Sequence, residues 1–456
     1  MKFGHRITGT VNEYDAKGRG TFKITTSTDG TTSRVVVPFT AVGDELAATF
    51  VHRDSGVKVA RLESIQTPSP DRVEAPCPHA GTCGGCLWQH LKYEAQLDIK
   101  RKMIQSAFTE AGDDQTIAPV VPCPSDKPFR SYYRNRMDYA IGWNSEIGLK
   151  EYGSWNRYVD VKTCFLLKED AGTILQHVRE WMTAQDLQPW DAKFYHGDIR
   201  YVVIREGKHT KQRIIIVVVH DAARIQSAGR EDLLNRLSPF CTSLLIGEQK
   251  LTTDISLAQT FEPLKGEPYF EEIANDVRYR IHPNSFFQTN TMMAEQLQRV
   301  VATHIQNEQQ KSKTILDLYC GLGFFGIYLA KQFPNIHVSG FEIDAEAIEL
   351  AKHNAETNNV SDRCTFTSGP AEDLSWKDID ADVIILDPPR SGLHPKVLKT
   401  VMEKKPETII YVSCNYHRLV EELKMFKELY EVEDVQALDL FPHTPHVEVI
   451  VKMKKR

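Results

Sequence analysis

Along the C-terminal third of the chain, short apolar runs alternate with stretches in which apolar residues recur at helical spacing. Strands rich in β-branched and aromatic residues are expected at 314–318, 337–344, 381–386 and 409–412. Helices are expected at 291–306, 325–332 and 416–430. This alternation predicts an α/β fold with a Rossmann-like sheet, in which ligands bind at the carboxyl ends of the strands.

The first 66 residues show a different pattern, with short alternating runs that predict a small β-barrel. Strands are expected at 6–13, 20–25, 33–38, 47–51 and 57–65, with a hairpin turn at Asp29-Gly30. Five short strands fit an OB-like barrel, a fold that often binds nucleic acid. The arrangement resembles the TRAM domain of RNA-modifying enzymes. A purely structural β-domain is the alternative, and the following basic residues favour RNA: Arg6, Lys17, Arg19, Lys23 and Arg34.

A β-rich central domain is expected between a linker at 67–71 and residue 285. It begins with a helix at 91–111 that ends before Gly112. Strands are expected at 129–142, 201–206, 213–220 and 277–281. The run 127–136 holds four basic residues and no acid, a pattern that suits phosphate contact or, alternatively, an exposed sheet face. We therefore divide the chain at 1–66, 67–285 and 286–456.

The composition is that of an ordinary globular protein and narrows the choice of function. A chain of 456 residues predicts two or three domains, and 41% of its residues are hydrophobic. It has no apolar run of 18 residues and starts without a signal peptide, so we expect a cytoplasmic location and no membrane partner. The net charge of −6 means that any RNA contact depends on local basic patches. We expect a monomer.

Three cysteines crowd into a glycine-rich stretch, with Cys77, Cys83 and Cys86 at C-x5-C-x2-C spacing. In a cytosolic protein such a group predicts a metal or iron–sulfur site before it predicts disulfides. Both zinc and iron–sulfur clusters normally take four protein ligands, so a fourth thiol must come from elsewhere. Cys164 is the preferred candidate and Cys123 the competitor. The spacing does not separate zinc from iron–sulfur.

A glycine-rich turn follows the strand at 314–318 and predicts a nucleoside-binding site. Gly321 and Gly323 let the backbone approach a ligand closely, and Glu342 ends the next strand, where an acid accepts hydrogen bonds from ribose hydroxyls. NAD is the usual rival ligand, but the D-x-x-x-G-x-G pattern favours S-adenosylmethionine. Asp387-Pro-Pro-Arg390 ends a later strand, and its arginine stands against methylation of an exocyclic amine.

Cys414 lies at the end of the strand at 409–412, where an open sheet places its ligands. A buried structural cysteine is the simpler interpretation of such a thiol taken alone. Glu448, in Phe441-Pro-His-Thr-Pro-His446-Val-Glu448, is either a surface acid or, near Cys414, a general base.

Taken together, these motifs resemble the RNA uracil-C5 methyltransferases that form 5-methyluridine, and in particular the ribosomal-RNA branch with a TRAM domain and a [4Fe–4S] cluster. The resemblance covers nearly the whole chain. It is carried by C-P-H-x-x-x-C-G-G-C at 77–86, F-F-Q-x-N at 286–290, Asp387-Pro-Pro-Arg, Ser413-Cys414-Asn415 and the motif that ends at Glu448.

The resemblance implies a role for each candidate residue. Cys414 is implied as the nucleophile and Glu448 as the base. The positions implied to bind S-adenosylmethionine or to position the uracil are Gln288, Tyr319, Glu342 and Asp387. The implied cluster ligands are Cys77, Cys83, Cys86 and Cys164. This chain departs from many members at Tyr416, where they have proline, and at Phe324, where they have asparagine.

The expected reaction is methylation of a uridine at C5 in 23S ribosomal RNA, through a cysteine adduct at C6. The same reaction on transfer RNA is one alternative. An iron–sulfur RNA-binding protein with an inactive methyltransferase half is another, and the presence of Cys414, Glu448 and Asp387 argues against it.

Overall fold

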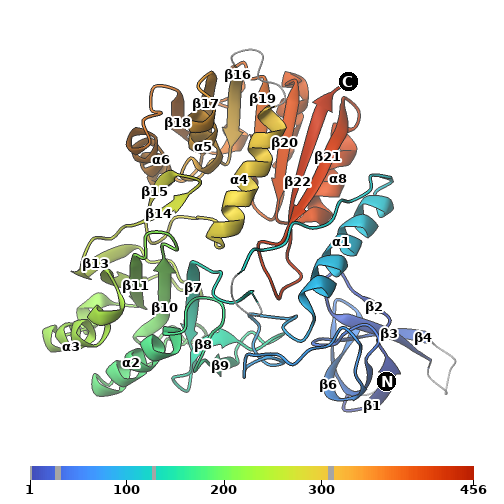
Figure 1. The fold of residues 1–456 in the computed structure, drawn as a ribbon. Helices are drawn as coiled ribbons and strands as arrows, with labels where there is room; N and C mark the ends of the chain where they lie inside the picture. Colours follow the sequence, from blue (N-terminus) through green and yellow to red (C-terminus); the bar gives the residue numbers. More distant parts are fainter. Residues whose placement is uncertain (1–2, 26–31, 126–129, 307–312) are drawn as a thin grey trace.

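The computed structural model describes residues 3–25, 32–125, 130–306 and 313–456. Three large sheets follow one another along the described residues, with a two-stranded sheet before the last, and Figure 1 shows the last large sheet above the other two. The Asp29-Gly30 turn and the start of the basic run at 127–129 lie outside the described residues. Within the described residues, no helix is long and apolar enough to cross a membrane.

The N-terminal sheet has six strands in the order β1-β5-β6-β4-β3-β2. The strands are β1 (Arg6–Thr10), β2 (Glu13–Tyr14), β3 (Gly20–Thr25), β4 (Thr32–Val37), β5 (Glu45–Asp54) and β6 (Val57–Thr67). The sheet curls on itself, because Gly9 of β1 leaves room for only the ring of Phe22 on β3. Ile7, Phe22 and Val35 belong to its own small apolar core. The predicted β-domain is present, with β2 as an additional strand.

The central sheet has seven strands in the order β13-β12-β11-β10-β7-β8-β9. Its strands are β7 (Arg136–Ile141), β8 (Ile147–Lys150), β9 (Tyr158–Asp160), β10 (Ile199–Glu206), β11 (Arg213–Val219), β12 (Ser243–Glu248) and β13 (Thr260–Lys265). Two helices, α2 (Ala171–Ala184) and α3 (Ser227–Leu237), lie together on it in Figure 1. The indole Nε1 of Trp181 donates to Gly229 O and joins these helices.

The predicted strand at 129–142 was wrong at its beginning. Arg130 and Tyr132 have positive φ angles of 46° and 62°, which no regular strand allows, so β7 starts only at Arg136. The guanidinium of Arg130 lies 4.0 Å from the ring centre of Tyr93, whereas Arg134 and Arg136 line the large cleft described below.

The third sheet has the order β18-β17-β16-β19-β20-β22-β21 and is parallel from β18 to β20. Its strands are β16 (Lys313–Leu318), β17 (Ile336–Glu342), β18 (Cys364–Ser368), β19 (Val383–Leu386), β20 (Thr408–Ser413), β21 (Tyr430–Leu438) and β22 (Glu448–Lys455). Because β16 lies between β17 and β19, the chain winds in opposite directions from it. Such a switch point opens a crevice at the carboxyl ends of the strands.

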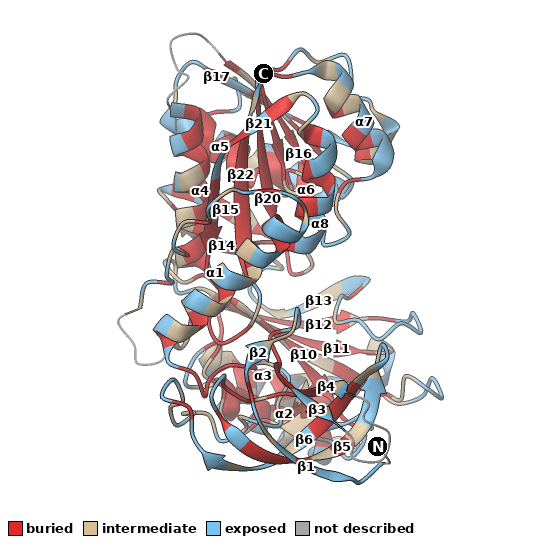
Figure 2. Ribbon diagram, turned by 90° about the vertical axis from the view of Figure 1, so that its right-hand side faces the viewer, coloured by how far each residue is buried: buried red, intermediate tan, exposed pale blue. Residues whose placement is uncertain are grey.

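Helices cover both faces of this sheet, and its central strands are buried throughout (Figure 2). One face packs against α4 (Thr291–Gln306), α5 (Phe324–Gln332) and α6 (Ala345–Thr357). The other packs against α1 (Tyr93–Glu110), α7 (Pro395–Lys404) and α8 (Tyr416–Phe426). A parallel sheet buried on both faces requires the continuous apolar runs seen in the sequence. The helix expected at 416–430 ends four residues early, since Tyr430 begins β21.

A short hairpin, β14 (Phe270–Ala274) with β15 (Val277–Ile281), precedes α4 and packs beside α6. Its two turn residues, Asn275 and Asp276, both have positive φ, as a tight hairpin turn requires. Helix α1 comes from the segment assigned to the central domain, yet Ile104 and Phe108 lie in the core of the third sheet. The boundaries at 66 and 285 remain predictions.

Candidate functional site

The loops at the carboxyl ends of the parallel strands bring the predicted catalytic residues together. Cys414 directly follows β20, and Glu448 begins β22, which runs antiparallel to β20 and so starts at the same end. The Cys414 thiol is partly exposed, whereas Glu448 is 3% exposed. Glu448 is therefore not a surface acid but a buried neighbour of the thiol.

Electrostatics at this edge oppose ionisation of both groups. Burial, followed by the negative charges of Glu448 and Asp387, raises the pKa of the Cys414 thiol to about 11. The Arg390 guanidinium acts in the opposite direction on that pKa. Burial and the charge of Asp387 hold the pKa of Glu448 well above its usual range. A thiol and a carboxyl with pKa values shifted this far, side by side at the edge of a cleft, are typical of a functional site.

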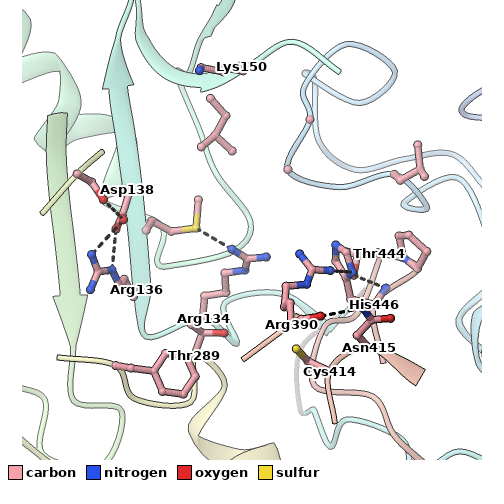
Figure 3. Close-up of a pocket in the computed structure, with 18 of the residues that line it drawn as sticks. Arg134, Arg136, Asp138, Lys150, Thr289, Arg390, Cys414, Asn415, Thr444 and His446 are labelled. Atoms are coloured by element: carbon pink, nitrogen blue, oxygen red, sulfur yellow. Dashed lines mark hydrogen bonds and ion pairs between the residues drawn. The ribbon is translucent and has the colours of Figure 1, made fainter. Parts of the chain in front are cut away.

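The Asp387 loop is tied to the nucleophile and to the segment before Glu448. Arg390 donates from Nη2 to Nδ1 of His446 over 3.0 Å. Asn415 donates from Nδ2 to the Arg390 carbonyl over 2.9 Å and accepts from the Arg418 amide, which caps α8. Figure 3 shows Cys414, Asn415, Arg390 and His446 together on one wall of the cleft. The link between Arg390 and His446 was not predicted, although both residues stand in quoted motifs.

Acidic groups gather beneath the cofactor turn. Glu342 Oε2 accepts from the Gly321 amide over 3.2 Å, and its Oε1 accepts from the Asp344 amide. Asp317, fully buried at the end of β16, accepts from the Gly326 amide with Oδ2, while its Oδ1 has no partner among the described residues. Burial and Asp387 raise the pKa of Asp317 to about 8, and burial and Glu342 raise that of Asp387 to about 7.

A ligand with a positive charge fits this surplus of acids, and the sulfonium of S-adenosylmethionine carries one. The turn itself is shaped for close approach, because Gly321 and Gly323 have φ angles of 52° and 79°. Tyr319 shares this left-handed conformation at 67°, directly after β16. A non-glycine residue held in this region is uncommon and is found more often at ligand sites.

Gln288, from the predicted cofactor set, and Phe324, a departure from the family pattern, are both held by packing in the interior. Gln288 is buried, and its main-chain carbonyl accepts from Nδ2 of Asn135, while its side chain makes no hydrogen bond among the described residues. Phe324 packs into an aromatic cluster with Tyr279 and Phe287, with ring centres 6.0 and 5.7 Å away. The departure at Phe324 thus serves the core rather than the ligand.

A cleft of about 1290 Å³ opens beside Cys414. Its lining residues come from the N-terminal, central and C-terminal parts of the chain. Its cations and aromatic rings include Lys17, Arg134, Arg136, Lys150, Arg390, Tyr152, Tyr201, Phe286, Phe287 and Tyr416. Arg136 pairs with Asp138 and Lys150 with Asp254, whereas Arg134 and Arg390 have no acidic partner among the described residues. Figure 3 shows Arg134 and Thr289 facing Cys414 across this cleft. Cations without an acidic partner and aromatic rings in one cleft together suit phosphate contact and base stacking.

The four predicted cluster cysteines line one small cavity, Cys77, Cys83 and Cys86 from the loop at 77–86 and Cys164 from the segment after β9. Burial raises the pKa of Cys83 to about 11 and that of Cys86 to about 12. A negative charge on Cys164 also acts to raise the pKa of Cys77, Cys83 and Cys86. The competitor, Cys123, lies elsewhere, against Asn290 Nδ2.

As placed, the residues of this cavity do not form a ready metal site. Within the described parts of the chain, no group of three or more histidine, cysteine or acidic side chains is arranged to hold a metal ion. The donor set nevertheless fits a soft cation, because four thiols line this cavity and a positive charge there would stabilise them as thiolates. The Gly85 amide already donates to the Cys83 sulfur over 3.4 Å.

Comparisons with known proteins agree with this geometry. Residues 269–456 match the family model described as tRNA (Uracil-5-)-methyltransferase. A tRNA (uracil(54)-C(5))-methyltransferase of Pyrococcus abyssi is 35% identical over 424 residues, 93% of this chain and 96% of its own. A 23S rRNA (uracil(747)-C(5))-methyltransferase of Pyrococcus horikoshii is 32% identical over 429 residues, 94% of this chain and 96% of its own.

A solved structure extends the likeness to the fold. The crystal structure of the Pyrococcus abyssi tRNA (uracil-54, C5)-methyltransferase in complex with S-adenosyl-L-homocysteine has a TM-score of 0.77 and 32% sequence identity. The match covers 98% of this chain and 100% of that one. The likeness therefore includes the N-terminal sheet and the cysteine-bearing loop as well as the third sheet.

Proposed function

The chain belongs to the tRNA (uracil-5-)-methyltransferase family as an S-adenosylmethionine-dependent RNA uracil-C5 methyltransferase, and we propose that it works through a covalent adduct with Cys414 on a uridine of 23S ribosomal RNA. The observation that carries the mechanism is the placement of a partly exposed thiol beside a buried carboxyl, with Cys414 and Glu448 at the same edge of the sheet.

The proposed reaction starts with the Cys414 thiolate. C5 of uracil is a weak nucleophile, and addition of sulfur to C6 converts the C5–C6 double bond into an enolate with its charge on O4. C5 then attacks the methyl group, which S-adenosylmethionine supplies on a sulfonium, and the methyl–sulfur bond breaks. Arg390 lowers the pKa of Cys414, and in this proposal it stabilises both the thiolate and the developing negative charge.

Glu448 completes the cycle as a general base. After methyl transfer C5 still carries its proton, and the Glu448 carboxylate removes it. The released electron pair restores the C5–C6 double bond, the C6–sulfur bond breaks, and Cys414 leaves as a thiolate. We propose that Asp387, which is partly exposed and interacts electrostatically with Glu342 and Glu448, hydrogen-bonds the polar edge of the base or the cofactor. The base reaches the thiol only when it leaves its stack, so we propose base flipping.

We propose that the N-terminal sheet is a TRAM-like RNA-binding barrel and that the cleft holds the RNA around the target uridine. Lys17 from this sheet lines the same cleft as Cys414, which supports a shared RNA path. We also propose that Gln288, Tyr319 and Glu342 bind S-adenosylmethionine or position the uracil. We also keep the prediction of a monomer.

We propose that Cys77, Cys83, Cys86 and Cys164 hold a [4Fe–4S] cluster with a structural role. The loop at 77–86 supports the cleft wall, because the Gly84 amide donates to Lys150 O and the Tyr152 amide donates to Thr82 O. A Cys83→Ala variant should lose the brown chromophore together with stability or RNA affinity. Full stability and affinity without the chromophore would contradict a structural role.

Transfer RNA is the second candidate substrate, and a specific observation favours it. The tRNA-modifying relative is 35% identical to this chain and the ribosomal one 32%. The ribosomal assignment rests on the resemblance of the N-terminal barrel and the cysteine motif to that branch.

Nucleoside mass spectrometry separates the two substrates. The purified protein is incubated with S-adenosylmethionine and, separately, with unmodified 23S ribosomal RNA and transfer RNA, and Cys414→Ala serves as the control. New 5-methyluridine in ribosomal RNA, absent with the variant, supports the proposal. Product in transfer RNA alone moves the substrate to the second candidate, and no product in either contradicts the catalytic proposal.

A further inference from the structure

The segment that precedes Glu448 is hydrogen-bonded to parts of the chain that lie outside the third sheet. Residues 439–447 connect β21 to β22, and four consecutive main-chain carbonyls of this segment each accept a hydrogen bond from an earlier part of the chain. Asn290 Nδ2 donates to Leu440 O, Lys100 Nζ to Phe441 O, Tyr133 Oη to Pro442 O and the Trp88 amide to His443 O.

Several of the interactions that fix this segment are buried, so water does not compete with them. Lys100 has no exposed surface and forms an ion pair with Asp439, itself fully buried, at the start of the segment. Gln96 accepts from the His443 amide over 2.8 Å. His443 has a φ of 66°, a conformation that costs about 1 kcal/mol or more for a residue with a side chain. The surroundings therefore impose the path of this segment, which its own residues do not favour.

Trp88 is the residue at which three parts of the molecule meet. It follows Cys86 by two positions, is fully buried, and donates from its indole Nε1 to Gly18 O of the N-terminal domain over 2.7 Å. Its main-chain amide donates a hydrogen bond to His443 O over 2.9 Å. A side chain added at Gly18 would lie 2.5 Å from Pro445 and 2.6 Å from the Trp88 ring, so these three residues are in tight contact.

We propose that Trp88 is a positioning residue: by joining the cysteine loop and the N-terminal domain to the 439–447 segment, it sets where Glu448 lies relative to Cys414. The inference rests on the proposed function, in which Glu448 removes the C5 proton. A base must stand within hydrogen-bond reach of that proton, and a misplacement of about 1 Å costs about a hundredfold in rate. A loosened segment should therefore slow proton removal more than methyl transfer.

The chain offers a matched control for the indole. Trp181 is equally buried, and its Nε1 also donates to a main-chain carbonyl, Gly229 O, over 2.8 Å. Trp88→Phe and Trp181→Phe lose the same kind of hydrogen bond, but only the first touches the segment. We expect Trp88→Phe to lower the multiple-turnover rate about tenfold. A methylated protein–RNA adduct should accumulate, while single-turnover methyl transfer changes less than about twofold. Trp181→Phe should change neither rate.

A second pair of variants acts through the same junction without touching tryptophan. Gly18→Ala and Gly112→Ala share the strain of a positive φ, 72° and 76°, but only Gly18 lacks room for the added carbon. Gly18→Ala should reproduce the adduct accumulation of Trp88→Phe, and Gly112→Ala should not. Equal effects in both members of either pair would overturn the proposal.

Hydrogen exchange gives a readout that does not need the reaction. The amides of residues 440–446 should exchange about tenfold faster in Trp88→Phe than in Trp181→Phe. Loss of the indole removes the bond to Gly18 and loosens the packing of Gly18 against Pro445, while the Trp88 amide keeps its bond to His443 O. Unchanged exchange there would overturn the proposal even if activity fell. If the unmodified protein methylated no RNA, the proposed function would fail, and the exchange result would still decide whether Trp88 holds this segment.

Discussion

Asp317 is a carboxyl with no exposed surface, and its replacement by asparagine tests the charge balance of the cofactor site. Burial, then the charge of Asp387, raises its pKa from 3.8 to about 8. Between these values the folded protein holds a proton on Asp317 that the unfolded chain has released. Stability contributed by this proton is fully present below pH 3.8 and is lost as the pH rises to about 8.

The expected magnitude follows from the size of this shift. One pKa unit corresponds to about 1.36 kcal/mol, so the roughly two units between pH 6 and the folded pKa are worth about 3 kcal/mol. The amide that replaces the carboxyl in Asp317→Asn has no proton to lose over this range. The free energy of unfolding of Asp317→Asn, minus that of the unmodified protein, should therefore grow by about 3 kcal/mol from about pH 6 to about pH 9 and level off above that.

Urea unfolding followed by circular dichroism at about pH 6, 7, 8 and 9 measures this difference. Asp362→Asn is the control, because that side chain is 76% exposed and its replacement should give the same difference at every pH. Titrating groups that do not interact with Asp317 are shared and cancel, and Asp387 is the acid whose charge acts on it most strongly. Parallel pH profiles for Asp317→Asn and the unmodified protein would refute the argument that this carboxyl is held protonated by burial.

Three further variants test the site. Glu448→Gln should retain at least about a tenth of the single-turnover methyl transfer but lose multiple turnover by about a hundredfold, with the methylated adduct accumulating on denaturing gels; normal turnover would contradict its role as base. Arg390→Gln should raise the pKa of Cys414, so alkylation of that thiol by iodoacetamide at about pH 9 should slow about three- to tenfold; faster alkylation would contradict the sign. Cys164→Ser should remove bound iron measured by plasma emission, whereas Cys123→Ser should keep it; equal iron in both would exclude Cys164 as a ligand.

The parts of the fold that follow from local apolar patterns were predictable from the sequence. Helix α4 has the predicted bounds, Thr291–Gln306, and β16, β17, β19 and β20 lie within a few residues of their predicted places. Strand β18 was not predicted. These elements are buried on defined faces, so their periodicity survives in the sequence. Helices α2 and α3 were missed, and β7 was started too early, because the basic residues before it alternate in the manner of a strand.

The candidate catalytic residues were predictable from motifs, but the contacts that position them were not. Cys414 and Glu448 were placed near one another by resemblance, and the pairing of β20 with β22 brings them to one edge. Lys100 reads as a surface lysine on a helix, and its partner Asp439 is 339 residues away along the chain. Local patterns carry no record of such a contact, which depends on how α1 packs against the third sheet.

The measurement that tests the central claim most directly is the identity of the residue bound to RNA during the reaction. An RNA in which 5-fluorouridine replaces uridine has no proton at C5 for Glu448 to remove, so the methylated adduct cannot break down. We predict that, with S-adenosylmethionine, mass spectrometry of the digested complex finds a methylated fluorouridine nucleotide on the peptide that contains Cys414. An adduct on another residue, or its absence while methyl transfer to ordinary RNA proceeds, would contradict covalent catalysis by Cys414.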